Sequence, residues 1–430
     1  MVEKWQELIA DKQKRRDESI PKEWVVYPPP ADRLNVLDFP EETGLLNEFE
    51  LEVTASPVEV LLPKLASGEW SSVDVTKAFY KRAIIAHQAV NCLTEIFVDK
   101  ALERAAYLDE ELKKTGKPIG PLHGLPISLK DQLAIKGFET TMGYVSWIGN
   151  YAEKDATLVE ILYEQGAVPF VRTNIPQTLM WPETFNNVFG RTSNPANRTL
   201  TCGGSSGGEG ALIAMKGSPL GVGSDIGGSV RIPANFNGLS GSAEDYASVT
   251  SITGEPLITT MSLNPNDPTF SKTRNFLIPP QAKSAYGLWQ IQKERTRLRC
   301  EHLDYWNSTA EKTGTGRPVD AIIGPMAAWA PPPHGMNSSA DYTMMWNALD
   351  YPSLAFPVTT VDPKLDKVKP PHQFLSEDDE AAYALFILDE GPELFKDAPI
   401  GLQVVGRTGE DEAVIAMGEI IDKALKESKK

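Results

Sequence analysis

The first half of the chain alternates between amphipathic stretches and short apolar runs. Polar and apolar residues are arranged as in helices over 3–16, 57–66, 73–89, 100–114, 155–164 and 207–215. Apolar runs bounded by turn residues predict short strands at 125–129, 167–171 and 220–223. Ser56 and Pro57 are typical of a helix cap and a first helical turn, which supports the helix that follows them.

The pattern changes after Ile232. Between Asn235 and Pro318 no stretch predicts a strand, and one long helix is expected over 282–306. The apolar stripe of this helix would consist of Leu288, Ile291, Leu298, His302 and Tyr305. Strands are predicted again at 319–323, 353–358 and 400–405, followed by a final helix that starts near Asp411.

This alternation predicts an α/β fold in which helices cover both faces of a mixed, twisted β-sheet core. Residues 1–70 would form an N-terminal helical and extended arm, and residues 71–430 a single α/β domain. The strand-free interval lies inside that domain and is abnormal for an α/β pattern. Functional residues of such folds lie at strand ends and in loops.

Charge and composition exclude several classes of function. The chain has 42 basic and 58 acidic residues, a formal net charge of -16, and such an acidic balance predicts neither a nucleic-acid nor a membrane partner. No apolar run reaches the roughly 18 residues of a membrane span. The N-terminus has the character of a charged amphipathic helix rather than a signal peptide, so we expect a cytoplasmic location.

Cysteine and histidine positions argue against a disulfide framework and against a metal site. Cys92, Cys202 and Cys300 are odd in number and widely spaced, which is typical of free thiols. The five histidines lack zinc-type spacing, and no cofactor-binding motif is recognised. Cys202 adjoins a glycine-rich turn, so a thiol nucleophile has to be considered there.

Two glycine-rich turns each present a serine. The segment GGSSGGEG at 203–210 contains Ser205, and GSDIGGSVRIP at 223–233 contains Ser229. Glycine permits unusual backbone geometry and lets several N–H groups approach one atom. The pair is therefore typical of the nucleophile and oxyanion-binding elements of an acyl-transfer site, with Lys130 at the end of a strand upstream.

Other interpretations of these turns stay open. GGSSG at 203–207 satisfies the G-x-S-x-G pattern of α/β-hydrolases, in which Ser205 would be the nucleophile and His302, His334 or His372 the base. The loop-like residues before Gly203 disagree with the strand that such an elbow requires. A phosphate-binding loop would lack its Gly-Lys-Ser/Thr signature. The turns could also merely connect elements.

Taken together, GGSSGGEGALI at 203–213 and GSDIGGSVRIP at 223–233 resemble the amidase signature family. HGLPISLKD at 123–131 is similar to its lysine motif, and NIPQTLM at 174–180 and NVFGRTSNP at 187–195 are similar to its linking motifs. GRPVDAIIGP at 316–325 and PIGLQVVG at 399–406 are similar to the C-terminal part of fungal-type acetamidases. The resemblance covers nearly the whole chain, with the core motifs at 121–238.

The resemblance implies a Ser–cis-Ser–Lys triad. Ser229 would be the nucleophile, Ser205 the bridging serine after a cis peptide bond from Gly204, and Lys130 the ultimate base. A lysine base must be uncharged, although its reference pKa is about 10.4, so burial and hydrogen bonds to hydroxyls must favour the neutral amine. The Ser205 hydroxyl would then relay protons between Ser229 and Lys130.

The same resemblance implies the residues that surround the triad. Substrate and oxyanion would be bound by Ile226, Gly227, Gly228, Ser229, Met180 and Ser205. Supporting roles would fall to Asp225, Arg231, Ser206 and Gly204, with Asp225 and Arg231 pairing to hold the nucleophile loop. Met180 and Trp181 follow a family motif and would narrow the pocket in favour of short amides.

After Gly238 the sequence departs from the family pattern. Residues 239–246 lead directly to SITGEPL at 251–257, which is similar to a segment much further along a fungal-type acetamidase. We infer an internal deletion of roughly 100 residues, joined within 239–246 and followed by the C-terminal portion 247–430. The strand-free interval falls in the same place.

Besides an α/β-hydrolase-type esterase that uses Ser205, which is the weaker alternative, two functions are consistent with this sequence. The first is hydrolysis of a small aliphatic amide, such as acetamide, to carboxylate and ammonia through an acyl-serine intermediate. The second is a truncated, catalytically impaired amidase-like protein. A small-molecule amide would be the partner in the first case, and a homodimer is left open.

Overall fold

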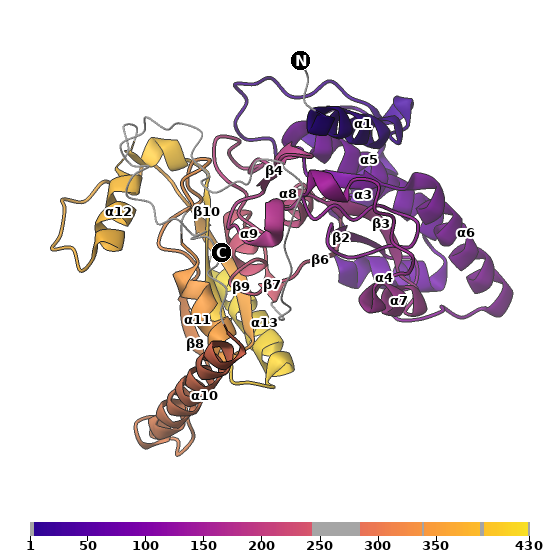
Figure 1. Cartoon of the computed structure of the whole chain (residues 1–430). Coiled ribbons are helices and arrows are strands. Elements are labelled where there is room, and N and C mark those ends of the chain that lie inside the picture. Colours follow the sequence, from indigo (N-terminus) through magenta and orange to yellow (C-terminus); the bar gives the residue numbers. More distant parts are fainter. Residues whose placement is uncertain (1–3, 243–283, 338, 388–390, 429–430) are drawn as a thin grey trace. The chain divides into compact units, whose positions relative to one another are not determined.

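The computed structural model describes residues 4–242, 284–337, 339–387 and 391–428 (Figure 1). The chain divides into two compact units. Among the described residues, the first unit ends at Gly223 and the second begins at Ser224. The sequence did not predict this boundary, which falls inside the second glycine-rich turn. The predicted deletion joint from residue 243 onward, and SITGEPL at 251–257, lie outside the described residues.

Helices make up most of the first unit. They are α1 (Lys4–Glu18), α2 (Phe39–Glu42), α3 (Glu48–Ala55), α4 (Val58–Ser67), α5 (Ser72–Val90), α6 (Val98–Thr115), α7 (Thr157–Glu164) and α8 (Gly207–Ala214), with 3-10 turns at Lys22–Trp24, Val145–Trp147 and Gln177–Leu179. Its strands are β1 (Leu93–Ile96), β2 (Pro126–Lys130), β3 (Val168–Thr173), β4 (Phe185–Asn186), β5 (Gly190–Arg191) and β6 (Gly221–Val222).

Four of these strands form a mixed sheet in the order β1-β3-β2-β6. Strand β2 pairs in parallel with β3 and β6, whereas β1 is antiparallel to β3. Every residue of β2 and β3 is buried, as expected for strands covered by helices. The register places Lys130 opposite Thr173, at the ends where both strands finish.

Helix α5 is the central packing element of this unit. Ser71 caps its start, and Asn91 ends it in the left-handed conformation. The Tyr80 hydroxyl donates a 2.5 Å hydrogen bond to the Phe170 carbonyl of β3, which ties the helix to the sheet. Arg82 extends to Thr54 and to the Met215 carbonyl after α8, so a buried guanidinium links three helices.

The N-terminal segment belongs to the same core as the sheet. Trp24, Val36, Phe39, Val53 and Leu61 are buried in one hydrophobic cluster with residues of α5, β2 and β3. The described part of residues 1–70, which were predicted to form a helical and extended arm, packs against the core of the first unit.

The second unit contains an antiparallel sheet in the order β7-β9-β10-β8. Its strands are β7 (Gly241–Ser242), β8 (Ile322–Pro325), β9 (Ser353–Thr360) and β10 (Pro399–Val405), and its helices are α9 (Arg231–Phe236), α10 (Ala285–Ser308), α11 (Asp341–Leu349), α12 (Glu377–Phe386) and α13 (Asp411–Ser428), with 3-10 turns at Thr309–Glu311 and Gly391–Phe395. Helix α9 is buried along its whole length and packs against β9 and β10. Mixed sheet and helices together confirm the predicted α/β class.

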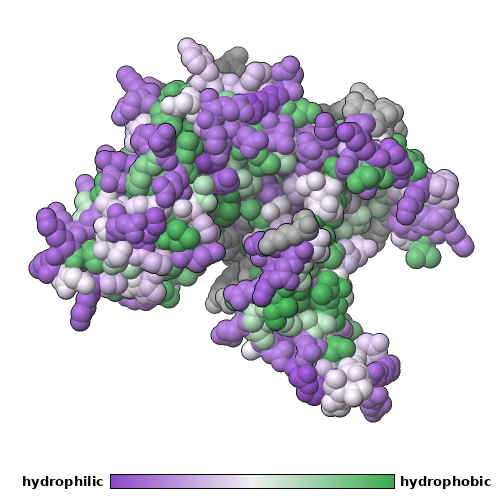
Figure 2. Space-filling model, turned by 180° about the vertical axis from the view of Figure 1, so that it is seen from behind, coloured by the Kyte–Doolittle hydropathy of each residue, from purple (hydrophilic) through white to green (hydrophobic). Residues whose placement is uncertain are grey.

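Helix α10 exposes several residues of its predicted apolar stripe. Ile291, Leu298 and Tyr305 of the predicted stripe are 49%, 46% and 66% exposed, and the buried residue is Trp306 instead. Trp306 packs in an aromatic cluster with Trp346 and Tyr351. Hydrophobic patches are visible on the otherwise mostly hydrophilic surface in Figure 2.

None of the helices in the described part of the chain is long and apolar enough to cross a membrane.

A buried ion cluster fixes α1 to the sheet. Lys12 is 2% exposed and pairs with Glu95 of β1 and with Glu139, whose carboxylate also accepts from Arg15 at 2.7 Å. Two positive groups at Glu139 lower the pKa of that carboxyl to about 2, although burial alone would raise it.

Replacing Lys12 should therefore weaken the attachment of α1 to the first unit. We expect Lys12→Met to lower the free energy of unfolding by about 3 kcal/mol, because Glu95 and Glu139 lose their shared cation inside the protein. The surface pair of Lys14 and Glu18 provides a matched control, since both side chains are largely exposed. Lys14→Met should change stability by less than about 0.5 kcal/mol. Equal effects of the two variants in denaturant titrations would contradict this assignment.

Candidate active site

Strand β2 carries Lys130 into the interior of the first unit. The residue has no exposed surface, and its Nζ donates a 2.8 Å hydrogen bond to Oγ of Ser205. Lys130 ends the strand, and Ser205 lies in the glycine-rich turn just before α8. The structure therefore brings together two of the three residues that the sequence assigned to a triad.

The turn at 203–208 is held by close backbone packing. The Gly204–Ser205 peptide bond is cis, the geometry that the family resemblance implied at this position. A Cβ atom on Gly204 would clash with the backbone of Trp181 and Glu183, so a larger residue does not fit there. Thr184 Oγ1 donates to the Gly203 carbonyl at 2.9 Å and accepts from the Gly207 N–H at 3.1 Å. These contacts fix the position of the Ser205 hydroxyl.

A buried carboxylate lies beside this site and was not among the predicted residues. Glu209, in the first turn of α8, is 5% exposed and accepts hydrogen bonds from Ser128 Oγ at 2.6 Å and Thr173 Oγ1 at 2.7 Å. Burial raises the pKa of Glu209 to about 7, against the opposing effects of both hydroxyls and of the Lys130 charge. One signal was present in the sequence: Glu209 is the only charged residue in GGEGALIA.

In the second unit, Asp225 organises the loop that contains Ser229. Its carboxylate accepts from the N–H groups of Gly228 at 2.7 Å, Val230 at 3.0 Å and Arg231 at 3.2 Å. It also forms the expected ion pair with the Arg231 guanidinium, at 3.0 Å. Burial alone would raise the pKa of Asp225, but Arg231 and the backbone donors lower it to about 2.

Residues from distant parts of the second unit bind Asp225 and Arg231 as well. We call this set of contacts the Asp225 clamp. Asn347 of α11 accepts from Arg231 Nη2 at 2.5 Å and donates to Asp225, while Gln403 of β10 accepts from Arg231 Nη1 at 3.2 Å. Gln403 in turn donates to two backbone carbonyls, at 2.7 and 2.8 Å. Sequence reasoning missed Asn347 and Gln403, because nothing in their local sequence marks them as partners of a residue more than 100 positions away.

The glycines before Ser229 are packed against α11. Gly228 has a φ of +126°, and a Cβ atom there would clash with Thr343 and Ile232. The Thr343 hydroxyl donates to the Gly227 carbonyl at 2.7 Å. The Gly228 N–H donates to Asp225 in this arrangement, and its role as an oxyanion donor stays a prediction.

The remaining predicted residues have varied surroundings. Ser229 is half-buried and Ser206 is buried, whereas Ile226 and Met180 are 36% and 50% exposed. Burial raises the pKa of the Cys202 thiol to about 12, so this group stays protonated near neutral pH and does not suit a thiol nucleophile. Within the described ranges, no three His, Cys, Asp or Glu side chains gather as metal ligands would.

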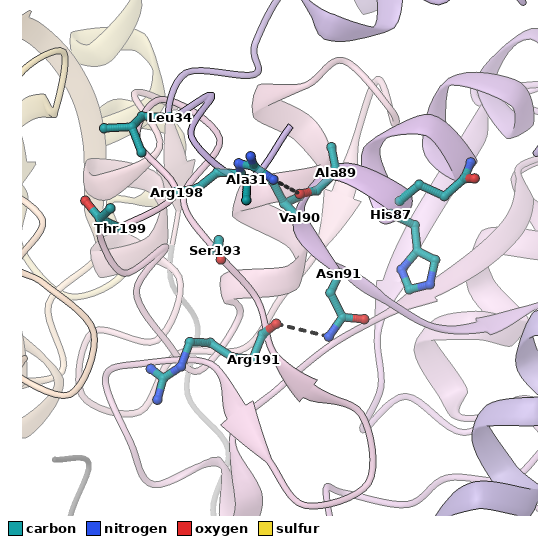
Figure 3. A pocket seen from close by; sticks show the side chains of 11 residues that line it. Ala31, Leu34, His87, Ala89, Val90, Asn91, Arg191, Ser193, Arg198 and Thr199 are labelled. Carbon is teal, nitrogen blue, oxygen red and sulfur yellow. Dashed lines mark hydrogen bonds between the residues drawn. The ribbon is translucent and has the colours of Figure 1, made fainter. Parts of the chain in front are cut away.

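A separate cavity of about 350 Å³ lies at the C-terminal end of α5 (Figure 3). Arg191 and Arg198 line it, but both guanidinium groups bind protein atoms. Arg198 donates to the carbonyls of Arg33, Ala89 and Pro30, and Arg191 pairs with Glu183. These arginines thus hold the N-terminal segment and the β4–β5 ribbon, and neither Lys130 nor Ser205 borders the cavity.

Comparison with known proteins assigns the chain to a family. The family model named Amidase matches residues 74–251 and 253–415. The chain belongs to the amidase family. It is similar to an acetamidase of Aspergillus oryzae, with 35% identity over 98% of this chain and 99% of that protein. An acetamidase of Emericella nidulans is 34% identical over 99% of both chains.

Solved structures agree with this membership. A fatty acid amide hydrolase aligns with a TM-score of 0.83 and 27% identity over 98% of this chain and 95% of that one. A structure described as an amidase aligns with a TM-score of 0.59 and 22% identity, over 86% of this chain and all of the other, and supports the fold. The amidase is thus an amide-hydrolysing enzyme by family, and the predicted amidase signature fold is confirmed.

The amidase is shorter than these relatives. Its alignment with the Aspergillus oryzae protein is 545 positions long, whereas this chain has 430 residues, so at least 115 positions hold no residue of this chain. This difference is of the size that the sequence analysis inferred for a deletion. The position of the joint within 239–246 stays a prediction.

The ionised state of Asp225 should contribute measurably to the stability of the second unit. Its pKa falls from an ordinary 3.8 to about 2, which corresponds to about 2.5 kcal/mol at 1.36 kcal/mol per pH unit. Because the folded-state pKa is the lower one, this stabilisation is present above pH 4 or so and is lost as the pH falls toward about 2.

Asp225→Asn should therefore destabilise the second unit at pH 7 by at least about 2 kcal/mol, and the difference from the wild type should shrink on acidification. Denaturant unfolding at pH 7 and pH 3 measures both effects. Asp422→Asn, which removes an exposed partner of Lys426, serves as the control and should leave the unfolding midpoint unchanged. A pH-independent loss in Asp225→Asn would exclude the ion pair as its cause.

Proposed function

We propose that this amidase hydrolyses a small aliphatic amide, such as acetamide, to a carboxylate and ammonia through an acyl-Ser229 intermediate. The observation that carries the proposal is the buried 2.8 Å hydrogen bond between Lys130 and Ser205, because it links an amine to a hydroxyl away from water. The names of the two acetamidase relatives support the choice of substrate.

The proposed chemistry begins with proton transfer. Ser229 Oγ attacks the amide carbon while its proton passes to Ser205 Oγ, and the Ser205 proton passes to neutral Lys130. The reverse relay protonates the leaving nitrogen, which departs as ammonia, and water then hydrolyses the acyl-serine by the same route. In this scheme each proton passes to Lys130 and is later returned by it, so no other acid or base is needed.

The tetrahedral intermediate would be stabilised by backbone donors around Ser229. Since the Gly228 N–H is engaged by Asp225, we assign this role to the N–H groups of Ile226, Gly227 and Ser229. The Asp225–Arg231 ion pair and the Thr343 bond to Gly227 support the geometry of these donors. Such a loop requires a fixed backbone, because oxyanion donors act only at hydrogen-bond distance.

Neutral Lys130 is the state that the reaction needs. Complete burial disfavours an ammonium group, and a hydroxyl partner can accept a proton as well as donate one. The alternative in which Ser205 is an α/β-hydrolase nucleophile is less well supported, since the segment before Gly203 contains no strand in the described structure beyond a single bridge at Thr201.

A shortened, catalytically impaired amidase is the second candidate function. It is favoured by the alignment with the Aspergillus oryzae acetamidase, in which at least 115 positions hold no residue of this chain. Such a protein would keep the Lys130–Ser205 pair and the Asp225 clamp yet turn over amides slowly or not at all.

Ser229→Ala should abolish ammonia release from acetamide, lowering kcat by about 10⁴-fold or more. The same variant should lose labelling by a fluorophosphonate probe, which reacts only with a competent serine nucleophile. Ser308→Ala, at an exposed serine of α10, is the matched control and should keep both. Absence of turnover and of labelling in the wild type would favour the impaired protein. Loss of labelling in Ser205→Ala but not in Ser229→Ala would favour the α/β-hydrolase reading.

Lys130→Ala should be nearly as damaging as Ser229→Ala, because the relay has no other base and its members act as a unit. We expect a fall in kcat of about 10³-fold or more with a smaller change in KM. The exposed Lys136 follows in the same segment, so Lys136→Ala is the control and should retain full activity. Full ammonia release by Lys130→Ala would remove the lysine from the role of base.

A further inference from the structure

Glu209 lies across three strands of the first sheet, next to the strand end that carries Lys130. Its two carboxylate oxygens accept from Ser128 of β2 and from Thr173 of β3. On β6, a Cβ atom on Gly221 would clash with the Glu209 carboxylate, so glycine at this position leaves room for it. The sheet therefore contains a closely fitted position for one carboxylate.

The two hydroxyl partners of Glu209 are the immediate neighbours of Lys130. Ser128 precedes Lys130 by two residues, so both side chains lie on the same face of β2. Thr173 is the residue that pairs with Lys130 across the parallel ladder. On the other side, Glu209 follows Ser205 by four residues, the spacing of one helical turn, although Ser205 itself precedes the helix. The carboxylate is thus held between the strand of the base and the turn of its serine partner.

We propose that Glu209 is a positioning residue whose ionised carboxylate, fixed by Ser128 and Thr173, supplies the counter-charge for the ammonium that forms on Lys130. This inference rests on the proposed function, because the ammonium forms when Lys130 takes the serine proton. No covalent bond to Glu209 forms or breaks: the proton goes from serine to lysine, and the carboxylate stabilises the charge that results.

The charge relation between the two groups follows from their burial. Burial raises the pKa of Glu209 to about 7, while the charge of Lys130 lowers it in part. By the same coupling, an ionised Glu209 favours the charged form of Lys130. An uncompensated ammonium in this fully buried position would be costly, so a nearby fixed anion makes proton uptake by the lysine easier.

Other buried groups lie around Glu209. Burial raises the pKa of the Cys92 thiol well above its usual range, and the Glu209 charge adds to that effect. Cys202 is a buried thiol as well. Asp131 follows Lys130 just beyond the end of β2 and accepts from Thr94 at 2.7 Å and from the Met142 N–H at 3.1 Å. Among these groups, Lys130 is the one whose charge lowers the pKa of Glu209.

The pH dependence of kcat/KM for ammonia release tests this role. In Glu209→Gln the acid limb should move to lower pH by about one unit, because Lys130 loses the anion that favours its protonated form. The plateau should fall about tenfold, since the ammonium formed in the reaction loses its counter-charge. Glu209→Asp keeps the charge, so its acid limb should stay near that of the wild type even where its plateau falls.

Glu50→Gln is the matched control for this profile. Glu50 is 7% exposed and is bonded to Lys81 and to the start of α3, far along the chain from the lysine motif. Loss of the Glu50 charge should leave the acid limb of the kcat/KM profile unchanged. A lower plateau without a shift of the limb in Glu209→Gln would indicate a purely structural role and would overturn the proposal.

A stability cycle tests the same coupling without turnover. At a pH on the acid limb of the wild-type profile, where Lys130 takes up its proton, we compare unfolding of the wild type, Glu209→Gln, Lys130→Met and the double variant in denaturant. If the two groups are coupled, the double variant should be less destabilised than the two single variants together predict. The unfolding equilibrium constant of the double variant should differ from that additive expectation by about fivefold or more. Additive effects would overturn the proposal. A wild type without turnover, combined with clear coupling, would instead disprove the proposed function and leave the charge link in place.

Discussion

The burial of the Lys130 amine is the constraint around which the first unit is arranged. An amine without solvent must be neutral or must have a fixed anion and hydrogen-bond acceptors near it. Strand β2 places Lys130 at the end of a ladder in which all its neighbours are buried, and the turn at 203–208 supplies the Ser205 hydroxyl. Glu209 adds the carboxylate. Helices α5 and α8 pack against this sheet, so the surrounding core also keeps water away from the amine.

The glycines of the two glycine-rich turns are required by close packing. At Gly204 and Gly228 the backbone of a neighbouring segment, or a threonine side chain, occupies the space of a missing Cβ. The backbone next to each serine is therefore held by close contacts. This explains why sequence motifs of small residues can indicate catalytic positions so well: the pattern records close approach of backbone, which only glycine tolerates.

Much of this arrangement was predictable from local sequence, and the rest depends on long-range contacts. Strands β2, β3, β9 and β10 and helices α4, α5, α6 and α13 have the expected bounds within a few residues, because each has a continuous apolar run or a clear periodicity. Strand β1 was missed, since four residues give too short a pattern, and α11 was missed because it follows no cap signal. Asn347 and Gln403 could not be assigned to Arg231, as a hydrogen bond across more than 100 residues leaves no local trace. Glu209 lay inside a recognised motif, but its buried partners Ser128 and Thr173 become visible only when β2 and β3 are paired.

The clamp around Asp225 bears on what a shortened chain can retain. Its partners are Thr343 and Asn347 of α11 and Gln403 of β10, all in the C-terminal part of the chain, after the predicted joint. The loop of Ser229 is therefore held by segments that this protein still has. The stability of that loop comes from an ion pair and hydrogen bonds within the second unit, and a deletion between residues 239 and 246 removes none of them. If activity is low, the reason would then lie in the substrate pocket or in how substrate is enclosed, rather than in the conformation of the nucleophile loop.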